Sequence, residues 1–282
     1  MLLTAGPYLP VYLEAYNERI DHIRVTSTIV DDLASAKVSI SIGTSNSASS
    51  SSATVRVTDG DGEQVHSSVV QFGQQGKLTV EFHVTSPRLW WCNGLGSPHL
   101  YTASFSLMAS DGAHLDGTST RFGIRRIELI QRPLDSKPGK TFMFRVNGKD
   151  IFAQGANWIP ADNLLPTITP KRYFDWIRLV QHGNMNMIRV WGGGVYETEA
   201  FLDACDEMGI LVWLDYALAN GDYPLHEEFL ESISREAEVQ TARVQNRACL
   251  ALLCGGNEDF LMFDWLRFVQ PSENHFFLYP WS

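Results

Sequence analysis

The feature that most limits the fold of this chain is a pattern repeated four times after about residue 125. Each repeat has a short, continuous apolar run, and segments with helical periodicity separate the runs. The runs are DIFAQGANW (150–158), MNMIRVW (185–191), ILVWLDY (210–216) and ACLALLCG (248–255). Continuous apolar strands alternating with helices are typical of parallel sheets covered on both faces. The pattern therefore predicts a β-α-β-α-β-α-β order.

The segments between the runs carry helix signals of their own. TPKRYFDWIRLVQHG has apolar residues at positions 173, 176, 177 and 180, which fall on one helical face. Thr169 is its expected N-cap, and Pro170 is its expected first residue. TEAFLDACDEMG is a second expected helix that ends at Gly209, and a third is expected from about His226 to Asn246.

Polar and aromatic residues follow each apolar run, and these residues distinguish a barrel from an open sheet. They are Asn157 and Trp158, Arg189 and Trp191, Asp215 and Tyr216, and Asn257 and Glu258. In a (β/α) barrel the carboxyl ends of the strands converge on one site. A doubly wound sheet would carry a glycine-rich phosphate loop after its first strand, and GANWIPAD is not such a loop. We therefore favour a (β/α) barrel over a doubly wound sheet.

The first 120 residues or so follow a different pattern. Their apolar runs are short, rich in β-branched residues and roughly alternating, with Gly, Asp and Ser between them. DGDG at 59–62 is a hairpin signal. This half predicts an antiparallel, immunoglobulin-like β-sandwich.

Composition excludes several classes of protein. A net charge of −10 argues against a nucleic-acid partner. No apolar run reaches the roughly 18 residues of a membrane span, and the start of the chain does not resemble a signal peptide. We expect a cytoplasmic or otherwise intracellular location. The four cysteines fit no metal motif, so we expect buried thiols in a reducing compartment; they are Cys92, Cys205, Cys249 and Cys254.

The residues after the fourth run are the main catalytic candidates. A carboxyl at the mouth of a barrel, such as that of Glu258, suits a general acid. Asn257 beside it can hydrogen-bond a substrate hydroxyl. The alternative is a strand turn with solvated acids.

Other candidates also have two interpretations. Arg189 lies within an apolar strand and needs a carboxylate partner, which is either structural or catalytic. Trp158 and Trp191 fit either the core or a stacking surface for a sugar ring. Asp162 either caps a turn after Pro160 or serves the site.

Several motifs, in order, resemble glycoside hydrolase family two, and within it the β-mannosidases of fungal intracellular type. They are LWWCNGLGSPHLYT, RFGIRRIEL, FRVNGKDIFAQGANWIPAD, MIRVWGGGVYE, GILVWLDY and CGGNEDF. TAGPYLPVYLEAY resembles the tail of the family's jelly-roll sugar-binding domain. The resemblance covers about residues 4–265. It implies a jelly-roll tail at 1–18, the immunoglobulin-like sandwich at 19–123 and, at 124–265, the first half of a (β/α)8 TIM barrel with strands one to four. An atypical tail follows at 266–282.

The resemblance implies a retaining exo-hydrolase of terminal β-D-mannose that acts on oligosaccharides and glycoprotein glycans without a cofactor or metal. Such enzymes use an acid/base carboxyl and a nucleophilic carboxylate about 5.5 Å apart. By motif match, Glu258 is the acid/base and Asn257 holds the sugar's 2-hydroxyl. Trp158 shapes the −1 subsite, Arg189 supports the nucleophile, and Trp191 and Asp162 line the pocket.

The family's nucleophile follows the seventh barrel strand and has no match here. We therefore expect little activity from this chain alone, and we expect its open barrel edges to favour self-association. Two alternatives stay open. One is a non-catalytic sugar-binding or immunoglobulin-like fragment, and the other is a related glycosidase such as an exo-glucosaminidase.

Overall fold

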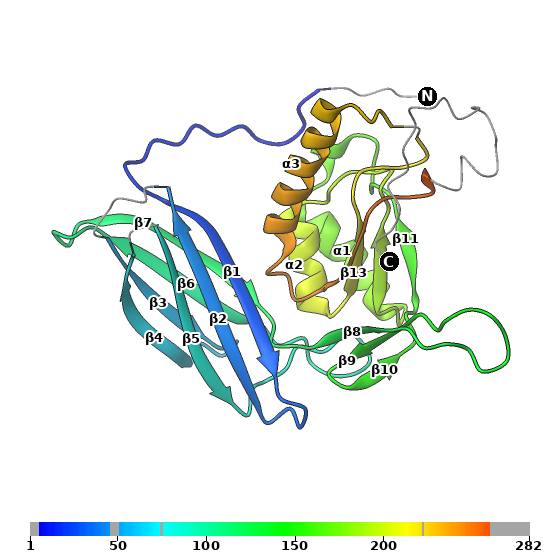
Figure 1. Ribbon diagram of the computed structural model, residues 1–282, viewed down its shortest axis with the longest axis horizontal. Coiled ribbons are helices and arrows are strands. Elements are labelled where there is room, and N and C mark those ends of the chain that lie inside the picture. Colours follow the sequence, from blue (N-terminus) through cyan, green and yellow to red (C-terminus); the bar gives the residue numbers. More distant parts are fainter. Residues whose placement is uncertain (1–5, 46–50, 74–75, 222, 260–282) are drawn as a thin grey trace.

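The computed structural model describes residues 6–45, 51–73, 76–221 and 223–259. The tail expected at 266–282 lies outside these residues. The N-terminal half forms two antiparallel sheets that face each other (Figure 1). One sheet has the order β1-β2-β5 and the other β4-β3-β6-β7. The strands are β1 (Ile20–Ile29), β2 (Ser35–Thr44), β3 (Ser52–Thr58), β4 (Gln64–Gln71), β5 (Lys77–Thr85), β6 (Tyr101–Met108) and β7 (His114–Phe122).

Alternation of buried and exposed residues builds the core between these sheets. In β5 every second side chain is buried, from Leu78 to Val84, and β2 and β3 supply Ile40 and Val55 from the two sheets. The predicted hairpin at DGDG is confirmed, because it joins the paired strands β3 and β4. Asp59 closes the turn by accepting from the backbone N–H groups of residues 61 and 63, at 2.9 and 3.0 Å.

A small antiparallel sheet follows the sandwich. Its strands are β8 (Ile127–Ile130), β9 (Met143–Val146) and β10 (Lys149–Ile151), in the order β10-β9-β8. The expectation of one strand over 150–158 is therefore wrong. That run ends in this sheet at Ile151 and resumes at Gly155 in another sheet, because exposed residues 152–154 carry the chain from one to the other.

The second half forms the predicted strand–helix alternation. Four strands pair in parallel and in sequence order: β11 (Gly155–Trp158), β12 (Met187–Val190), β13 (Leu211–Asp215) and β14 (Leu250–Cys254). Between them lie the 3-10 turn η1 (Leu165–Thr167) and the helices α1 (Pro170–His182), α2 (Glu199–Met208) and α3 (Glu227–Val244). A sequential order is what a (β/α) barrel requires, and the half-barrel stays a prediction.

The predicted helix ends are confirmed. The Thr169 side chain accepts from the Arg172 N–H at the start of α1. Gly209 ends α2 in the left-handed conformation, with φ +72°. These local signals were readable because capping needs only neighbours in sequence.

The two faces of the parallel sheet differ. One face packs its apolar side chains, such as Ile188 and Leu214, into a core shared with α1 and α2. Register places Asn157, Arg189 and Trp213 side by side on the other face. This second face carries the candidate site.

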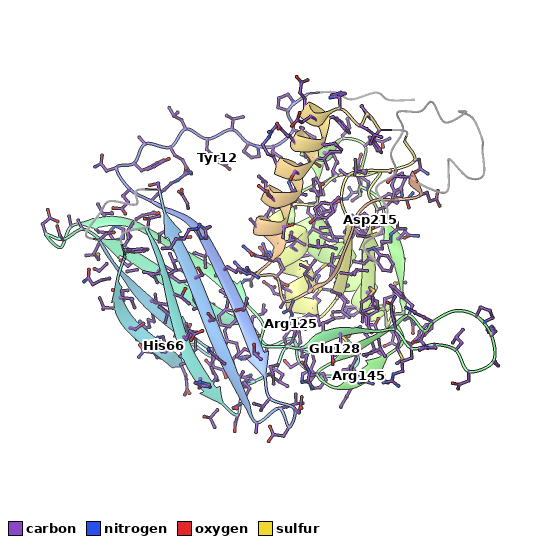
Figure 2. All side chains as sticks on the ribbon, in the orientation of Figure 1. Tyr12, His66, Arg125, Glu128, Arg145 and Asp215 are labelled. Atoms are coloured by element: carbon purple, nitrogen blue, oxygen red, sulfur yellow. The ribbon has the colours of Figure 1, made fainter. Side chains whose placement is uncertain are left out.

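Sandwich and parallel sheet are joined by direct hydrogen bonds. The indole of Trp90 is fully buried and donates to the carbonyl of Asp206 in α2, at 2.8 Å. The guanidinium of Arg125 donates to three backbone carbonyls before and within β14, at 2.7–3.1 Å. The side chain of Asn246 bonds two backbone groups of β1, accepting from the N–H of Val25 and donating to the carbonyl of Ile23. Figure 2 shows Arg125 at this junction.

Candidate active site

The centre of the candidate site is an ion pair between neighbouring strands. Arg189 of β12 donates to both carboxylate oxygens of Asp215 at the end of β13, at 2.6 and 3.3 Å. The Asp215 side chain is 0% exposed. It also accepts from the Trp213 indole at 2.9 Å and from the Gly192 N–H at 3.2 Å. This carboxylate is thus fully engaged within the protein.

Arg189 also connects the ends of the outer strands. Its guanidinium donates to the side-chain oxygen of Asn257 at 2.8 Å and to that of Asn157 at 3.4 Å. Asn257 is buried, at 6% exposure. The predicted residues Arg189, Asn157, Asp215 and Asn257 are therefore brought together. Because the guanidinium engages the Asn257 oxygen, the amide NH₂ of Asn257 points to the opposite side.

Glu258 follows Asn257 at the surface. Its backbone is left-handed, with φ +57°, and its side chain is exposed. The carboxylate accepts a hydrogen bond from the side chain of Asn220 at 2.9 Å. The candidate acid is thus presented to solvent beside Asn257 while one oxygen is held.

Asn220 is a site residue that sequence reasoning missed. It lies in the loop after β13, and its side-chain oxygen accepts from Asn257 Nδ2 at 3.2 Å while its NH₂ holds Glu258. Its backbone N–H donates to the Asn257 carbonyl at 3.0 Å. A left-handed backbone, with φ +53°, makes this geometry reachable. The available signal was an Asn-Gly pair after a strand, which is common in ordinary turns.

The three glycines after β12 are required by close packing. A Cβ on Gly192 would lie 2.6 Å from the Tyr216 carbonyl oxygen, and one on Gly194 would lie 2.9 Å from Pro160 Cδ. A Cβ on Gly193 would overlap the ring of Trp191, which folds over it. The ring of Trp191, the residue after β12, therefore lies against the backbone of Gly193.

Trp158 and Asp162 lie apart from this network. Trp158 is on the helix-facing side of the sheet, where its ring centroid is 5.0 Å from that of Phe201. Its indole donates to Glu197 at 2.8 Å. Asp162 accepts from the Leu164 N–H at 3.1 Å and pairs with Arg172 at 3.9 Å. Among the described residues, neither side chain makes a hydrogen bond, ion pair or ring contact with Asn257 or Glu258.

Comparisons with known proteins find similar glycosidases. The family described as glycosyl hydrolases family 2 matches residues 18–125. Over 260 residues, 92% of this chain, the sequence is 42% identical to β-mannosidase B of Thermothelomyces thermophilus and 41% identical to that of Aspergillus fumigatus. Along most of its length the chain is therefore similar to glycosyl hydrolases of family 2 type. It spans 30% of the length of these two relatives.

Two solved structures also superpose on most of this chain. A β-D-mannosidase from Dictyoglomus thermophilum superposes with a TM-score of 0.81 at 32% identity, covering 87% of this chain and 30% of that one. A β-glucuronidase from Parabacteroides merdae superposes with a TM-score of 0.72 at 22% identity, covering 86% of this chain and 30% of that one. At that identity the second likeness concerns the fold alone.

The prediction of buried thiols is confirmed for three of the four cysteines. Cys92, Cys205 and Cys249 are buried, Cys254 is half-buried, and all four are unpaired. Burial raises the pKa of the Cys92 thiol to about 11. It also raises the pKa values of Cys205 and Cys249 well above their usual range. These three thiols are therefore poor nucleophiles.

Within the described residues, no group of three or more His, Cys, Asp or Glu side chains is placed to hold a metal ion. None of the helices in that same part of the chain is long and apolar enough to cross a membrane.

Proposed function

We propose that this chain carries the acid/base side of a retaining β-mannosidase site, with Glu258 as the acid/base. The observation that carries the proposal is the exposed Glu258 carboxylate directly beside Asn257, after the fourth parallel strand. The Asn220 side chain donates a hydrogen bond to Glu258, and the Arg189 guanidinium donates one to Asn257. The 42% identity to a fungal β-mannosidase B supports mannose as the sugar.

The fold assigned in this proposal is an immunoglobulin-like sandwich at 19–123 followed by half a (β/α)8 barrel at 124–265. Residues 1–18 correspond to the tail of a jelly-roll domain. The sequential parallel order of β11 to β14 supports the half-barrel. In a barrel, the face with Asn157, Arg189 and Trp213 is the inner one, because the helices cover the other.

The polar groups have different roles in the proposed reaction. Glu258 donates a proton to the oxygen of the leaving group and later removes one from the attacking water. Asn257 donates its free amide hydrogen to the sugar's 2-hydroxyl, and Arg189 acts as a positioning residue that fixes this amide. Trp191 and Asp162 line the pocket from the loops after β12 and β11. Trp158 acts from behind the sheet, through its packing on Phe201.

The proposed reaction needs a second, attacking carboxylate. Asp215 does not fit this role, because its side chain is 0% exposed and is held by Arg189. Asp259 does not fit either, since one of its oxygens is buried and burial raises its pKa. We therefore propose that the 282 residues alone have negligible turnover. The substrates proposed are oligosaccharides and glycoprotein glycans with terminal β-D-mannose.

We also propose self-association through the sheet edges. β11 pairs only with β12, and β14 only with β13, so in the described residues both strands leave one edge unpaired. Unpaired edges are templates for another strand. Concentration-dependent sedimentation of the purified chain is the expected result, and a monomer at all concentrations would contradict it.

A chimera tests the catalytic proposal directly. This chain replaces the matching 30% of the Thermothelomyces thermophilus β-mannosidase B. We expect the chimera to hydrolyse p-nitrophenyl β-mannoside and β-mannobiose, and the isolated chain to hydrolyse neither. Glu258→Gln in the chimera should lower kcat/KM on β-mannobiose by about 10²–10⁴-fold. The loss of kcat/KM should be smaller on p-nitrophenyl β-mannoside, because p-nitrophenolate leaves without a proton.

The matched control is Asp259→Asn, which removes the neighbouring carboxylate. Equal losses on both substrates for Glu258→Gln would contradict an acid role. The proposal also states that the 282 residues alone lack the attacking carboxylate. Robust turnover by the isolated chain, abolished by Glu258→Gln, would contradict that statement.

A further inference from the structure

The loop after β13 runs beside Asn257, where the two strands have ended. The Asn257 N–H donates to the carbonyl of Leu218 at 2.9 Å, and the Asn220 N–H donates to the carbonyl of Asn257 at 3.0 Å. Ala219 and Asn257 form a parallel bridge. These contacts extend the pairing of β13 and β14, so the backbone of Asn220 is fixed next to Asn257 and Glu258.

The side chain of Asn220 belongs to a row of hydrogen bonds that all have the same direction. Arg189 donates to the Asn257 side-chain oxygen at 2.8 Å, and the Asn257 NH₂ group donates to the Asn220 side-chain oxygen at 3.2 Å. The Asn220 NH₂ group then donates to Glu258 Oε2 at 2.9 Å. A guanidinium has donors and no acceptor, so it fixes the orientation of both amides. Asn220 therefore presents a donor to Glu258.

This donor decides which oxygen of Glu258 can carry a proton. A proton on Oε2 would face the N–H of Asn220, whereas a proton on Oε1 leaves Oε2 free to accept that hydrogen bond. Glu258 is exposed, so its carboxyl group is accessible from solvent. The contact with Asn220 therefore favours the protonated form in which Oε1 carries the proton.

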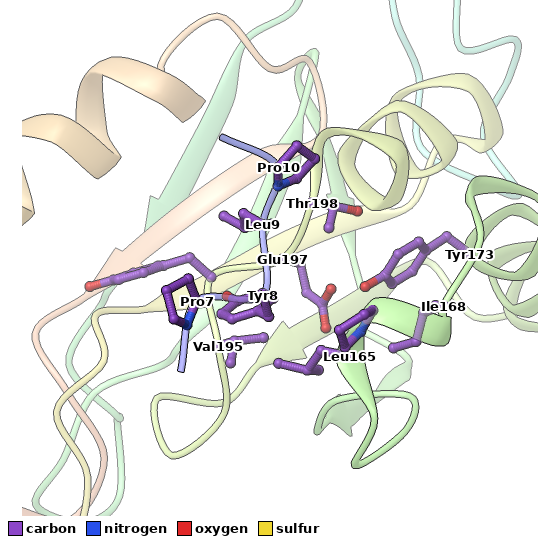
Figure 3. A pocket seen from close by; sticks show the side chains of 12 residues that line it. Pro7, Tyr8, Leu9, Pro10, Leu165, Ile168, Tyr173, Val195, Glu197 and Thr198 are labelled. Atoms are coloured by element: carbon purple, nitrogen blue, oxygen red, sulfur yellow. The ribbon is translucent and has the colours of Figure 1, made fainter. Parts of the chain in front are cut away.

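Another glutamate near the strand ends has different surroundings. Glu197 is 2% exposed, and the indole of Trp158 and the hydroxyl of Tyr173 both bond its carboxylate (Figure 3). Glu258, in contrast, accepts from one amide in the described part of the chain. The Glu197 carboxylate is thus engaged within the protein, whereas that of Glu258 keeps an oxygen for a substrate.

Tyr223 fixes the backbone from which the Asn220 side chain extends. Its hydroxyl accepts from the Ala219 N–H at 2.7 Å and donates to the Ala219 carbonyl at 3.3 Å. Its ring stacks on that of Phe229 in α3, with centroids 6.1 Å apart and planes 13° apart. A Cβ on Gly221 would lie 3.0 Å from the Tyr223 ring, so the ring covers this glycine closely. Through Ala219, α3 thus supports the left-handed backbone of Asn220, with φ +53°.

We propose that Asn220 is a positioning residue that directs the acid proton of Glu258 to Oε1, and that Tyr223 keeps Asn220 in place; this rests on the acid/base role proposed above for Glu258. In the first step the proton moves from Oε1 to the glycosidic oxygen as the bond from that oxygen to the anomeric carbon breaks. The attacking carboxylate forms its bond to the same carbon. Glu258 becomes a carboxylate, and the Asn220 NH₂ group stabilises its charge at Oε2.

The test uses the chimera with Thermothelomyces thermophilus β-mannosidase B and compares two substrates. The leaving group of β-mannobiose needs a proton, and that of p-nitrophenyl β-mannoside does not. Asn220→Gly removes the side chain and suits a left-handed backbone, so the fold should survive. It should lower kcat/KM on β-mannobiose by about tenfold, as expected for one hydrogen bond to a charged group. On p-nitrophenyl β-mannoside the loss should be about threefold or less, because only the contact with Asn257 matters there.

Tyr223→Phe tests the support of Asn220. It keeps the ring on Phe229 and removes the hydroxyl that bonds Ala219. We expect a loss of about threefold on β-mannobiose and a smaller one on p-nitrophenyl β-mannoside. The matched control for the glycine variant is Asn184→Gly, because Asn184 is exposed after α1 and is also left-handed, with φ +58°. It should leave kcat/KM on both substrates within about twofold of the parent value.

Asn220→Asp gives a readout that a purely structural role would not change. Asp also tolerates the left-handed backbone, and it places a negative charge beside Glu258 Oε2. The other charged groups nearby, Asp259, Asp215 and Arg189, stay the same. The alkaline limb of the kcat/KM profile on β-mannobiose should move to higher pH by roughly 0.5 to 1 pH unit, since a like charge opposes loss of the acid proton.

Three results would each overturn this inference. They are equal losses on both substrates for Asn220→Gly or Tyr223→Phe, a loss in Asn184→Gly as large as that in Asn220→Gly, and an unmoved alkaline limb in Asn220→Asp. The proposed function would survive any of them if Glu258→Gln in the same chimera still showed its larger loss on β-mannobiose. Equal losses for Glu258→Gln itself would instead overturn the proposed function.

Discussion

At the scale of single residues, the site depends on amides that hold other side chains. Asn220 contacts both residues of the Asn257–Glu258 pair, at 3.2 and 2.9 Å, from a different loop. Arg189 contacts Asn157, Asp215 and Asn257 at once. A half-buried arginine with three partners belongs to a network in which removing one member leaves the others unsatisfied.

The first prediction concerns this arginine. Arg189→Met should lower the free energy of unfolding by about 3 kcal/mol, because Asp215 stays buried without its cation. Arg178→Met is the control, since Arg178 is 51% exposed and pairs with Asp175 on the surface of α1; it should cost less than about 1 kcal/mol. Urea unfolding measures both. Equal effects would mean that the Arg189–Asp215 pair contributes no more than a surface pair.

At the scale of elements, the end of β14 explains the motif CGGNEDF. The strand ends at Cys254, and two glycines precede Asn257. Neither glycine is in the left-handed region; that conformation falls on Glu258 itself. Gly256 is needed for space instead, because a Cβ there would meet the Leu218 carbonyl oxygen at 2.9 Å and the Asp259 carboxylate. A Cβ on Gly255 would meet nothing within 4 Å.

This difference predicts opposite outcomes for two neighbouring alanines. Gly256→Ala should lower the free energy of unfolding by about 1–3 kcal/mol, because the loop after β13 must shift to admit the methyl group. Gly255→Ala should be neutral or stabilising by about 0.5 kcal/mol, since it only restricts the unfolded chain. Thermal or urea unfolding compares the two. Equal costs would show that backbone freedom, and not space, requires the glycines.

At the scale of the whole molecule, the sandwich and the parallel sheet are held in one arrangement. Arg125 follows directly on the sandwich and donates to the carbonyls of Arg247, Ala248 and Leu250, which position β14. At Gly123 a Cβ would lie 2.7 Å from both Trp90 and Ala248, so the two halves approach closely there. The site at the end of β14 therefore depends on a contact with the other half of the molecule.

The third prediction tests this coupling. The chain should unfold in a single calorimetric transition, and Arg125→Met should lower the free energy of unfolding by about 2–4 kcal/mol, because three carbonyls lose their donor. Arg145→Met, which removes only a surface pair with Asp150, is the control and should cost less than about 1 kcal/mol. Two separate transitions in the parent chain, or equal costs for both variants, would contradict the coupling.

Much of the architecture was readable from local patterns. Alternation predicted the sandwich strands, periodicity predicted the helices, and Thr169 and Gly209 marked helix ends. Caps, turns and periodicity involve residues within a few positions of each other, so a linear sequence contains them. The break between β10 and β11 was missed, because both parts of DIFAQGANW are extended and only their partners differ.

By itself, the sequence determined the order of strands and helices and brought Arg189, Asn257 and Glu258 forward as candidates, because these follow from spacing along the chain. Only the tertiary structure decided which face each strand-end residue occupies. It placed Arg189 against Asp215 and Asn257, and Trp158 on the far side against Glu197. It also placed Asn220, from the loop after β13, in hydrogen-bond contact with Glu258. Those contacts join residues 26–68 positions apart, and packing of the strands, not local periodicity, brings such residues together.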